Sequence, residues 1–170
     1  MNSITREEAR ESIIALKLPP IVLDIFDDQP LPFDLANIMR SPCELFAMSS
    51  SEQSKYGNGH YTPIWSSSSG YSVVAHHREN DVGFFVRFNL EAPESLKHAV
   101  RMNWQQLLIA EFQFLWESEY SDADLEEIAR LFDFRHVREV ARGLADLDRT
   151  AALSIDEWRS ELHMRLRDVS

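Results

Sequence analysis

The chain has one cysteine, few glycines and no long apolar run. A single cysteine, Cys43, excludes a disulfide within the chain and a zinc site built from several cysteines. The five glycines do not form a loop of the kind that cradles phosphate. No stretch approaches the ~18 apolar residues of a membrane-spanning helix. The first residues, MNSITREEARES, are polar and acidic, so we expect neither a signal peptide nor a transit peptide, and a cytoplasmic location.

Basic residues are also scarce: 17 lysines and arginines stand against 28 acidic residues, giving a net charge of −11. Contacts to phosphates need clustered Lys and Arg, so we expect no nucleic-acid partner and no anionic membrane surface. A field of this sign favours association with a basic protein. The alternative is that the charge only keeps the protein dissolved.

The first third of the chain shows short helices separated by prolines. Thr5 and Glu8 form a capping-box pattern that predicts a helix as far as Leu18, where Pro19 and Pro20 follow. A second short helix is predicted over residues 20–27, because proline is tolerated at a first helical position. The sequence then predicts either a strand or a helical turn at 33–40, a short helix at 41–48, and a loop at 49–54.

Residues 60–91 change to the two-residue alternation of strands. Strands are predicted at Tyr61–Trp65 and Tyr71–Arg78, followed by a turn and a third strand over 84–90. The third strand places Phe84, Val86, Phe88 and Leu90 on one face. The pattern indicates a three-strand antiparallel meander with one buried face.

After Pro93 the period becomes helical. An apolar stripe runs from Trp104 to Trp116, further helices are predicted from Ser121 and over 137–147, and Ser154 with Glu157 opens a last helix. The predicted fold class is therefore α+β. Its central antiparallel sheet is built on the meander at about 60–91, with N-terminal helices and a C-terminal helical extension at 121–170.

The residues that catalysis uses are present but not in a known arrangement. His76 and His77 are adjacent on a predicted strand and therefore point to opposite faces, and His60 lies across the hairpin. Their spacing matches no metal motif. Cys43 lies on a short, largely apolar helix, where a buried, inert thiol is expected. We therefore expect no catalytic residues, no metal site, no cofactor and no enzymatic activity.

The segment Asp146–Glu157, DLDRTAALSIDE, resembles the calcium loop of an EF-hand. Acidic and hydroxyl side chains fall at several ligand positions, but Ala151 stands where the loop needs glycine for its sharp turn. The alternative is a helix–loop–helix in which Ser154 caps the second helix. If this segment binds calcium at all, weak binding is expected.

Two runs carry acidic charge without any Lys or Arg. Residues 21–34 contain four acids, and residues 111–127 contain seven. A solvated helix face normally mixes the two signs, so a run of one sign indicates a surface for a cationic partner. Some of these acids also favour helix N-termini. The seven acids are Glu111, Glu117, Glu119, Asp122, Asp124, Glu126 and Glu127.

Two segments resemble the SUKH superfamily. ALKLPPIVLDIF, residues 15–26, is similar to that family's opening, in which a helix, Leu-Pro-Pro and a short helix follow one another. GHYTPIW followed by GYSVVAHH is similar to its central hairpin. The resemblance implies one SUKH-like α+β domain over 1–170, with 121–170 as an extension. It also implies a non-enzymatic role, because many bacterial members are immunity proteins that bind and neutralise toxins, often nucleases.

These lines together predict a cytoplasmic protein that binds a cognate toxin or another basic protein. The alternatives are a regulatory adaptor with a cellular partner, a histidine-dependent enzyme and a calcium-responsive module. Aromatic side chains are favoured anchors at interface centres, although ordinary sheet packing explains them as well. The residues expected to contact the partner are Glu117, Glu119, Asp122, Asp124, Tyr61, Trp65 and Tyr71.

Overall fold

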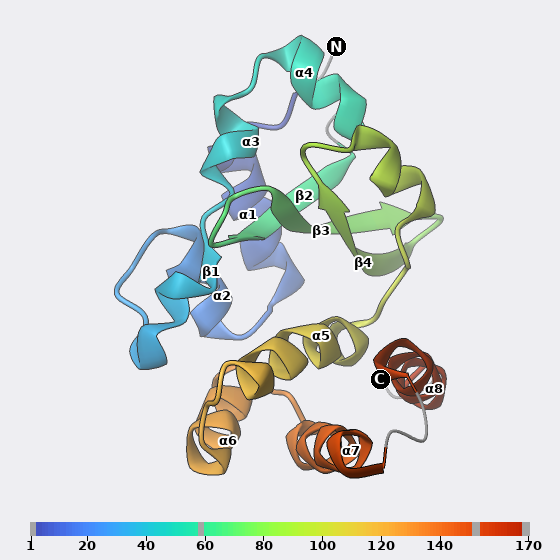
Figure 1. Cartoon of the computed structure of the whole chain (residues 1–170). Helices are drawn as coiled ribbons and strands as arrows, with labels where there is room; N and C mark the ends of the chain where they lie inside the picture. Colours follow the sequence, from blue (N-terminus) through green and yellow to red (C-terminus); the bar gives the residue numbers. More distant parts are fainter. Residues whose placement is uncertain (1–2, 58–59, 151–153, 168–170) are drawn as a thin grey trace. The chain divides into compact units, whose positions relative to one another are not determined.

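The structure, a computed structural model, describes residues 3–57, 60–150 and 154–167. Over these residues the chain has an α+β fold, with one antiparallel sheet between helices at both ends of the sequence (Figure 1). The chain divides into two compact units, residues 1–101 and residues 102–170. Unit 1 contains the sheet, and unit 2 is helical. The single domain expected from the sequence stays a prediction.

The two N-terminal helices form as their capping residues predict. Helix α1 (Arg6–Leu16) begins after Thr5, whose hydroxyl accepts a hydrogen bond from Glu8 N at 3.2 Å, while the Glu8 carboxylate accepts one from Thr5 N at 2.8 Å. These bonds satisfy backbone donors that have no partner inside the helix. Helix α2 (Pro20–Phe26) has its proline at the first helical position, as predicted.

The segment between α2 and the hairpin contains more structure than predicted. Both alternatives for residues 33–40 occur, as a 3-10 helix η1 (Pro32–Asn37) followed by a short strand β1 (Met39–Arg40). The loop predicted for residues 49–54 is wrong, because Ser49 and Glu52 form a capping box that starts a helix. The elements that follow β1 are α3 (Cys43–Ala47), α4 (Ser50–Gln53) and the 3-10 helix η2 (Ser54–Tyr56).

The predicted meander forms the larger part of the sheet. It consists of β2 (Tyr61–Ser67), β3 (Ser72–Glu79) and β4 (Val82–Asn89), and a 3-10 helix η3 (Pro93–His98) follows it. Over the described residues the sheet has four strands in the order β1-β2-β3-β4, and not three, because β1 pairs with the end of β2. A strand of two residues is too short for alternation to reveal it.

The turn between β3 and β4 has a backbone conformation that suits its residues, Asn80 and Asp81. Asn80 and Asp81 have φ angles of 49° and 66°, and two consecutive positive φ values are those of the type I′ turn, which matches the twist of a hairpin. Asn and Asp tolerate this conformation better than other residues that carry a Cβ. The turn therefore fixes the register in which Glu79 pairs with Val82.

Both faces of the sheet are buried, so the prediction of one buried face is wrong. One face carries the predicted apolar set of β3 and β4, packed around Leu45 and Tyr56. The other face carries Val74 and Trp65, each 1% exposed, and α1 and α2 pack against β2. A register shift between Pro63 and Trp65 reverses the alternation within β2, so that Trp65 joins Val74 on this second face.

Unit 2 contains the helices α5 (Trp104–Glu117), α6 (Asp122–Leu131), α7 (Val137–Thr150) and α8 (Ile155–Arg165). Helix α7 contacts each of the other three, and α6 and α7 lie next to one another (Figure 1). Polar side chains at the start of α5 hold the ends of α6 and α8. Gln105 donates to the Asp133 carbonyl at 2.7 Å, and Gln106 donates to the His163 carbonyl at 2.7 Å. These bonds satisfy carbonyls that helix ends leave open.

None of the described helices combines the length and the apolar character needed to cross a membrane.

Candidate protein-binding surface

The acidic run of unit 2 lies where α5 ends and α6 begins. Glu117 is the last residue of α5, and Glu119 follows in the left-handed conformation, with φ 63°. The hydroxyl of Ser121 then caps α6 by accepting a hydrogen bond from Asp124 N at 3.2 Å. Asp122 and Asp124 stand in the first turn of α6, where the helix dipole stabilises negative charge. The local sequence therefore places four acids around the junction of α5 and α6.

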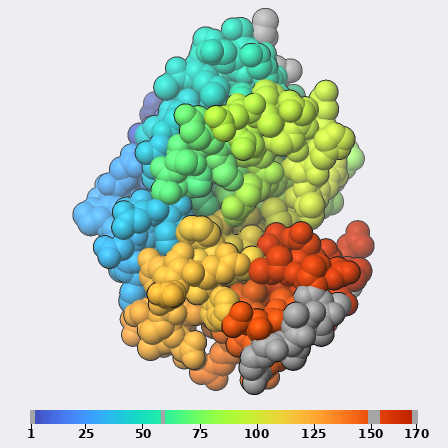
Figure 2. All heavy atoms as spheres, in the orientation of Figure 1, coloured from blue at the N-terminus to red at the C-terminus, as the bar shows by residue number. Residues whose placement is uncertain are grey.

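These acids differ in exposure. Glu117, Glu119, Asp122 and Glu127 are exposed and Asp124 is half-buried. Glu111, by contrast, is 5% exposed, so it is not part of this surface. The stretch around residue 120, yellow-orange in Figure 2, forms part of the visible surface. We use the name acidic corner for the set Glu117, Glu119, Asp122, Asp124 and Glu127.

The charge of the acidic corner is not balanced by ion pairs within the described part of the chain. Among the residues that the structure describes, no Lys, Arg or His forms an ion pair with any member of the corner. Its polar contacts are with neutral groups: Gln113 donates to the Glu117 carboxylate at 2.7 Å, and Ser121 donates to Asp124 at 2.6 Å. The charge is therefore available to a partner.

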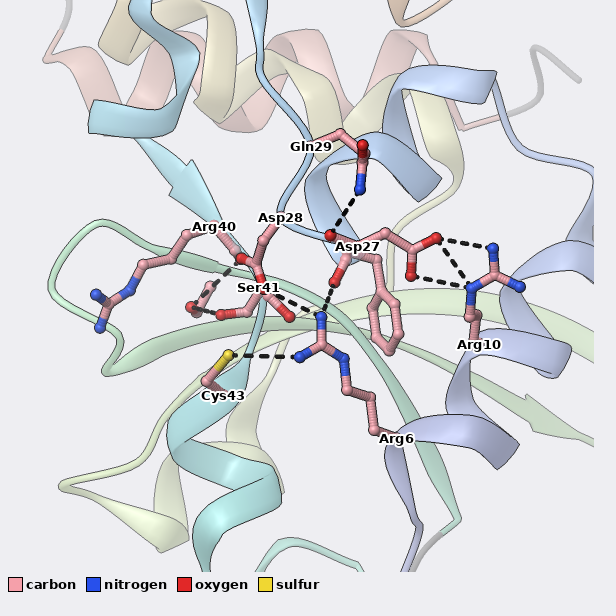
Figure 3. A network of polar contacts seen from close by, with 10 residues as sticks. Arg6, Arg10, Asp27, Asp28, Gln29, Arg40, Ser41 and Cys43 are labelled. Atoms are coloured by element: carbon pink, nitrogen blue, oxygen red, sulfur yellow. Dashed lines mark hydrogen bonds and ion pairs between the residues drawn. The ribbon is translucent and has the colours of Figure 1, made fainter.

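In the other acidic run, at residues 21–34, two of the four acids form ion pairs within unit 1. Arg10 donates three hydrogen bonds to the Asp27 carboxylate at 2.8–2.9 Å. Arg6 pairs with Asp28 (Figure 3), at 3.0 Å, and also donates to the Phe26 carbonyl at 2.7 Å. Both arginines come from α1 and hold the end of α2. Asp27 and Asp28 thus link α2 to α1. That this run attracts a partner stays a prediction.

A groove beside the acidic corner is formed by α5, α6 and α7. Its volume is about 370 Å³. The charged side chains that line it are Asp122 and Glu126 from α6, and Arg138 and Arg142 from α7. The apolar lining comes from Trp116, Leu125, Val137, Ala141 and Ala145. Asp122 belongs both to the groove and to the acidic corner, so the two features form one continuous surface.

One ion pair crosses from α7 to α6 at this groove. Arg138 Nε donates to Glu126 Oε1 at 2.8 Å, and the two side chains are 79% and 36% exposed. This hydrogen bond and the positive charge of Arg138 lower the pKa of Glu126. A second hollow, of about 320 Å³, is also lined by Glu126, Val137 and Arg138. The ion pair therefore belongs to the walls of both hollows.

The aromatic residues predicted as anchors do not form one surface. The Tyr61 ring stacks on His77 with ring centroids 4.5 Å apart, and Tyr71 is 48% exposed. Trp65 is 1% exposed, which is the ordinary sheet packing that the sequence left open as its alternative. Tyr61 pairs with His77 and Trp65 pairs with Val74, so the register shift sends Tyr61 and Trp65 to opposite faces.

The three histidines are not brought together either. His77 Nδ1 donates to the His60 carbonyl at 2.7 Å, since a carbonyl can only accept, and the two rings are 6.4 Å apart between centroids. His76 lies on the opposite face, with its ring against Phe85. Burial lowers the pKa of His76. Among the described residues no three His, Cys, Asp or Glu side chains are placed to share a metal ion.

Comparison with known proteins finds no family model, no curated protein and no solved structure that matches the chain with significance.

The segment resembling a calcium loop is mostly helical. Helix α7 continues to Thr150, beyond its predicted end at 147, so Asp146 and Asp148 lie on a helix and not in a loop. Glu157 accepts hydrogen bonds from the Ser154 backbone and hydroxyl at 2.8 Å each, and these bonds lower its pKa. Residues 151–153, including Ala151, lie outside the described residues. This geometry agrees with the helix–loop–helix alternative and differs from an EF-hand loop.

The expectation of a buried Cys43 is wrong, because the residue is exposed. Cys43 is the first residue of α3, a helix of five residues whose buried side chain is Leu45. A helix of five residues buries few of its side chains, so Cys43 at its start stays exposed. Arg6 Nη1 lies 4.0 Å from the Cys43 sulfur and donates to it (Figure 3).

The sequence predicts the acidic corner but not the groove. The pattern over 137–147 predicts a helix and does not indicate that Val137, Arg138 and Ala141 line a groove. A sequence signal existed, because Val137, Ala141 and Ala145 recur every four residues on one side of α7. That recurrence does not tell a buried side from the wall of a groove. The difference depends on how far α6 stands from α7, which only the structure gives.

Proposed function

We propose that this protein binds a basic protein partner and neutralises it, in the manner of an immunity protein that blocks a toxin. The observation that carries the proposal is the acidic corner, whose exposed carboxylates have no ion-pair partner among the described residues. Holding like charges together is unfavourable in the free protein. A cationic partner would relieve that repulsion on binding.

The contrast between the two acidic runs supports the proposal. Two of the acids at 21–34, Asp27 and Asp28, contribute to the fold through ion pairs with arginines of α1. Among the described residues the acids of the corner form no ion pair, and Asp122 and Asp124 contribute only through their place in the first turn of α6. Charge that does not stabilise the fold is best explained by its effect on other molecules.

The chemistry of a toxin that acts on nucleic acid fits this surface. Such an enzyme holds phosphates with clustered Lys and Arg. Carboxylates spaced along the end of one helix and the start of the next can stand in for phosphates and cover the groove where the nucleic acid would bind. Long-range attraction would also speed the encounter, which matters for an inhibitor that must act before its target does. The resemblance of residues 15–26 to the SUKH superfamily points to the same role.

The histidines are not gathered into one site. His76 and His77 lie on opposite faces of the sheet, and the His60 carbonyl orients only the ring of His77. The alternative of a histidine-dependent enzyme would therefore have to rest on His77.

The experiment that tests the proposal is affinity capture with the tagged full chain from lysate of its own organism, at low and at high salt. A single stoichiometric, basic partner that is lost at high salt is the expected result. Adding the purified partner's own substrate then tells the two candidate roles apart: an inhibited activity supports neutralisation, and an unaffected activity supports a regulatory adaptor instead. A partner that is acidic, or capture that is insensitive to salt, would overturn the proposal.

A further inference from the structure

The second hollow described above lies where α6 ends and α7 begins, and its lining carries more positive than negative charge. Three arginines line it: Arg130 from α6, Arg135 from the connection between the helices, and Arg138 from α7. Glu126 is the acid of the lining. The apolar lining comes from Ala129, Phe134 and Val137. We use the name arginine hollow for this feature, which contrasts with the net charge of −11 of the whole chain.

The Glu126 carboxylate in the arginine hollow is already paired. Arg138 Nε donates to Glu126 Oε1 at 2.8 Å, and this hydrogen bond lowers the pKa of Glu126. The charge of Arg130 lowers the same pKa further. Arg130 follows Glu126 by four residues, so both side chains lie on one side of α6. The negative charge of the lining is therefore balanced by Arg138, and the positive charges of the other two arginines remain.

Arg130 and Arg135 are available to an anionic ligand. Among the residues that the structure describes, Arg130 forms no ion pair. Arg135 reaches Asp133 at 3.4 Å, and the two side chains are 58% and 64% exposed. An ion pair at such exposure contributes little to stability, so Arg135 can turn to another anion at small cost.

We propose that the arginine hollow binds a small phosphate monoester. Arg130 and Arg135 donate to the phosphate oxygens, and the organic group of the ester contacts the apolar lining. A guanidinium presents its N–H groups as a planar fork, which matches the oxygens of a phosphate. The volume of about 320 Å³ lies at the lower end of small-molecule sites, so the hollow has room for a phosphate and a small organic group.

The charge of the ligand follows from the charge of the site. A phosphate monoester carries about −1.5 to −2 at neutral pH, which balances two arginines. A carboxylate carries a single negative charge and would leave one of them without a partner. A cationic ligand would meet Arg130 and Arg135 directly, and like charges in contact oppose binding. No residue of the arginine hollow belongs to the acidic corner, so this inference goes beyond the proposed function and does not depend on it.

Acids outside the arginine hollow weaken the attraction for an anion without cancelling it. Glu127 is exposed and precedes Arg130 by three residues on α6, and Asp133 contacts Arg135. Salt screens the more distant acids, because the Debye length is ~8 Å at physiological ionic strength. Binding of the phosphate is therefore expected to strengthen when Asp133 loses its charge.

The test uses the purified, isotope-labelled full chain and three probes at equal ionic strength: phenyl phosphate, inorganic phosphate and benzoate. Titrations are run at about pH 7.5, above the second pKa of phosphate near 6. Phenyl phosphate is expected to shift the amide NMR signals of Ala129 and Val137 in a saturable way, while the Trp116 indole signal in the neighbouring groove stays in place. Benzoate lacks the second charge and inorganic phosphate lacks the apolar contact, so each is expected to bind at least about threefold more weakly.

Two variants test the arginines themselves. Arg130→Gln and Arg135→Gln are each expected to weaken phenyl phosphate binding by about twofold to fivefold, the range that an exposed ion pair allows. Arg78→Gln is the matched control, because Arg78 is an exposed arginine of unit 1 that pairs with Asp81 at 3.2 Å. It changes the net charge by the same amount and is expected to leave the affinity unchanged. An equal loss in the control would show that only the net charge matters and would overturn the inference.

A gain of affinity is expected from Asp133→Asn, which releases Arg135. The expected factor is again about two to five. Asp81→Asn is the control, because Asp81 also pairs with an exposed arginine and shares the left-handed backbone conformation of Asp133, with φ 66° against 51°. Asn tolerates this conformation, so both variants are expected to fold. Equal tightening by the two variants would contradict the inference.

The three probes distinguish the sources of the phosphate group. Equal affinities of phenyl phosphate and inorganic phosphate would overturn the ester in favour of free phosphate. Equal affinities of phenyl phosphate and benzoate would overturn the selectivity for phosphate, and the lack of a saturable shift at Ala129 and Val137 would overturn the site itself. None of these titrations contains a protein partner, so their outcome leaves the proposed function to the capture experiment.

Discussion

A β-carbon added at Gly143 would clash with Nε1 of Trp158 and lie 2.8 Å from its Cε2. Gly143 is on α7 and Trp158 is on α8, so the missing side chain lets these helices approach closely. The Trp158 ring is 8% exposed and can move only as a whole. The contact between α7 and α8 therefore depends on a glycine in the interior of a helix, where alanine would otherwise be preferred.

From this contact we predict that Gly143→Ala lowers the free energy of unfolding. Overpacking of this kind costs roughly 1–3 kcal/mol, against a gain of at most ~1 kcal/mol from the better helix former. Urea unfolding followed by circular dichroism measures the loss. Adding Trp158→Leu to the variant makes room for the new methyl group, so the double variant should be more stable than the sum of the single effects. Strict additivity would show that the two residues do not interact.

Trp65 and Tyr71 are expected to respond differently to truncation. Trp65 is 1% exposed in the core of unit 1, so Trp65→Ala should cost roughly 3–5 kcal/mol or prevent folding. Tyr71 is 48% exposed, and Tyr71→Ala should change the free energy of unfolding by no more than about 0.5 kcal/mol. Thermal unfolding of the two variants side by side measures this. A folded, stable Trp65→Ala variant would contradict the burial of that ring.

The stability of the protein should fall as the pH drops below neutral. Burial lowers the pKa of His163, with a further contribution from Arg159. Burial also lowers the pKa of His76, aided by His77 and Arg78. A folded-state pKa below the unfolded value means that the unfolded chain binds more protons, so this stability is present above about pH 6.5 and is lost as the pH falls through the folded-state pKa.

Urea midpoints measured between about pH 7.5 and pH 5 test the direction of this pH dependence. The range extends from above to below the pKa of histidine in an unfolded chain. The wild-type midpoint should fall toward the acid end, and His163→Gln should flatten part of that dependence. His98→Gln is the control, because it removes an exposed histidine. A midpoint that rises as the pH falls would contradict the assignment.

The thiol of Cys43 should react in the folded protein. The residue is exposed at the start of α3, and access is a first condition for thiol reactivity. A disulfide reagent that releases a coloured product is expected to titrate one thiol per chain without denaturant. A thiol that reacts only after urea is added would contradict this exposure and would support the buried thiol expected from the sequence.

Local signals predicted most of the helices and strands. The boxes Thr5/Glu8 and Ser154/Glu157 mark helix starts because every partner lies within three residues. The same signal was present at Ser49 and Glu52, and the serine-rich composition of that segment concealed it. The alternation of β4 is likewise a property of one strand and needs no knowledge of its neighbours.

Features that join distant residues were not predictable in this way. Arg10 and Asp27 are 17 residues apart, and nothing in the run at 21–34 shows that α1 supplies its cations. Arg138 and Glu126 are 12 residues apart on different helices, and their pairing depends on how α6 packs against α7. The acidic corner could be foreseen because it is contiguous in sequence, whereas the groove beside it could not.

Whether the acidic corner binds the partner can be tested by removing its charge and repeating the affinity capture. Glu117→Gln, Glu119→Gln and Asp122→Asn are combined in one variant. Glu7→Gln, Glu11→Gln and Asp24→Asn, three exposed acids of unit 1, form a control with the same net charge. At low salt we expect the corner variant to lose most of the captured partner while the control retains it. Equal capture by the two variants would show that the acidic corner does not bind the partner.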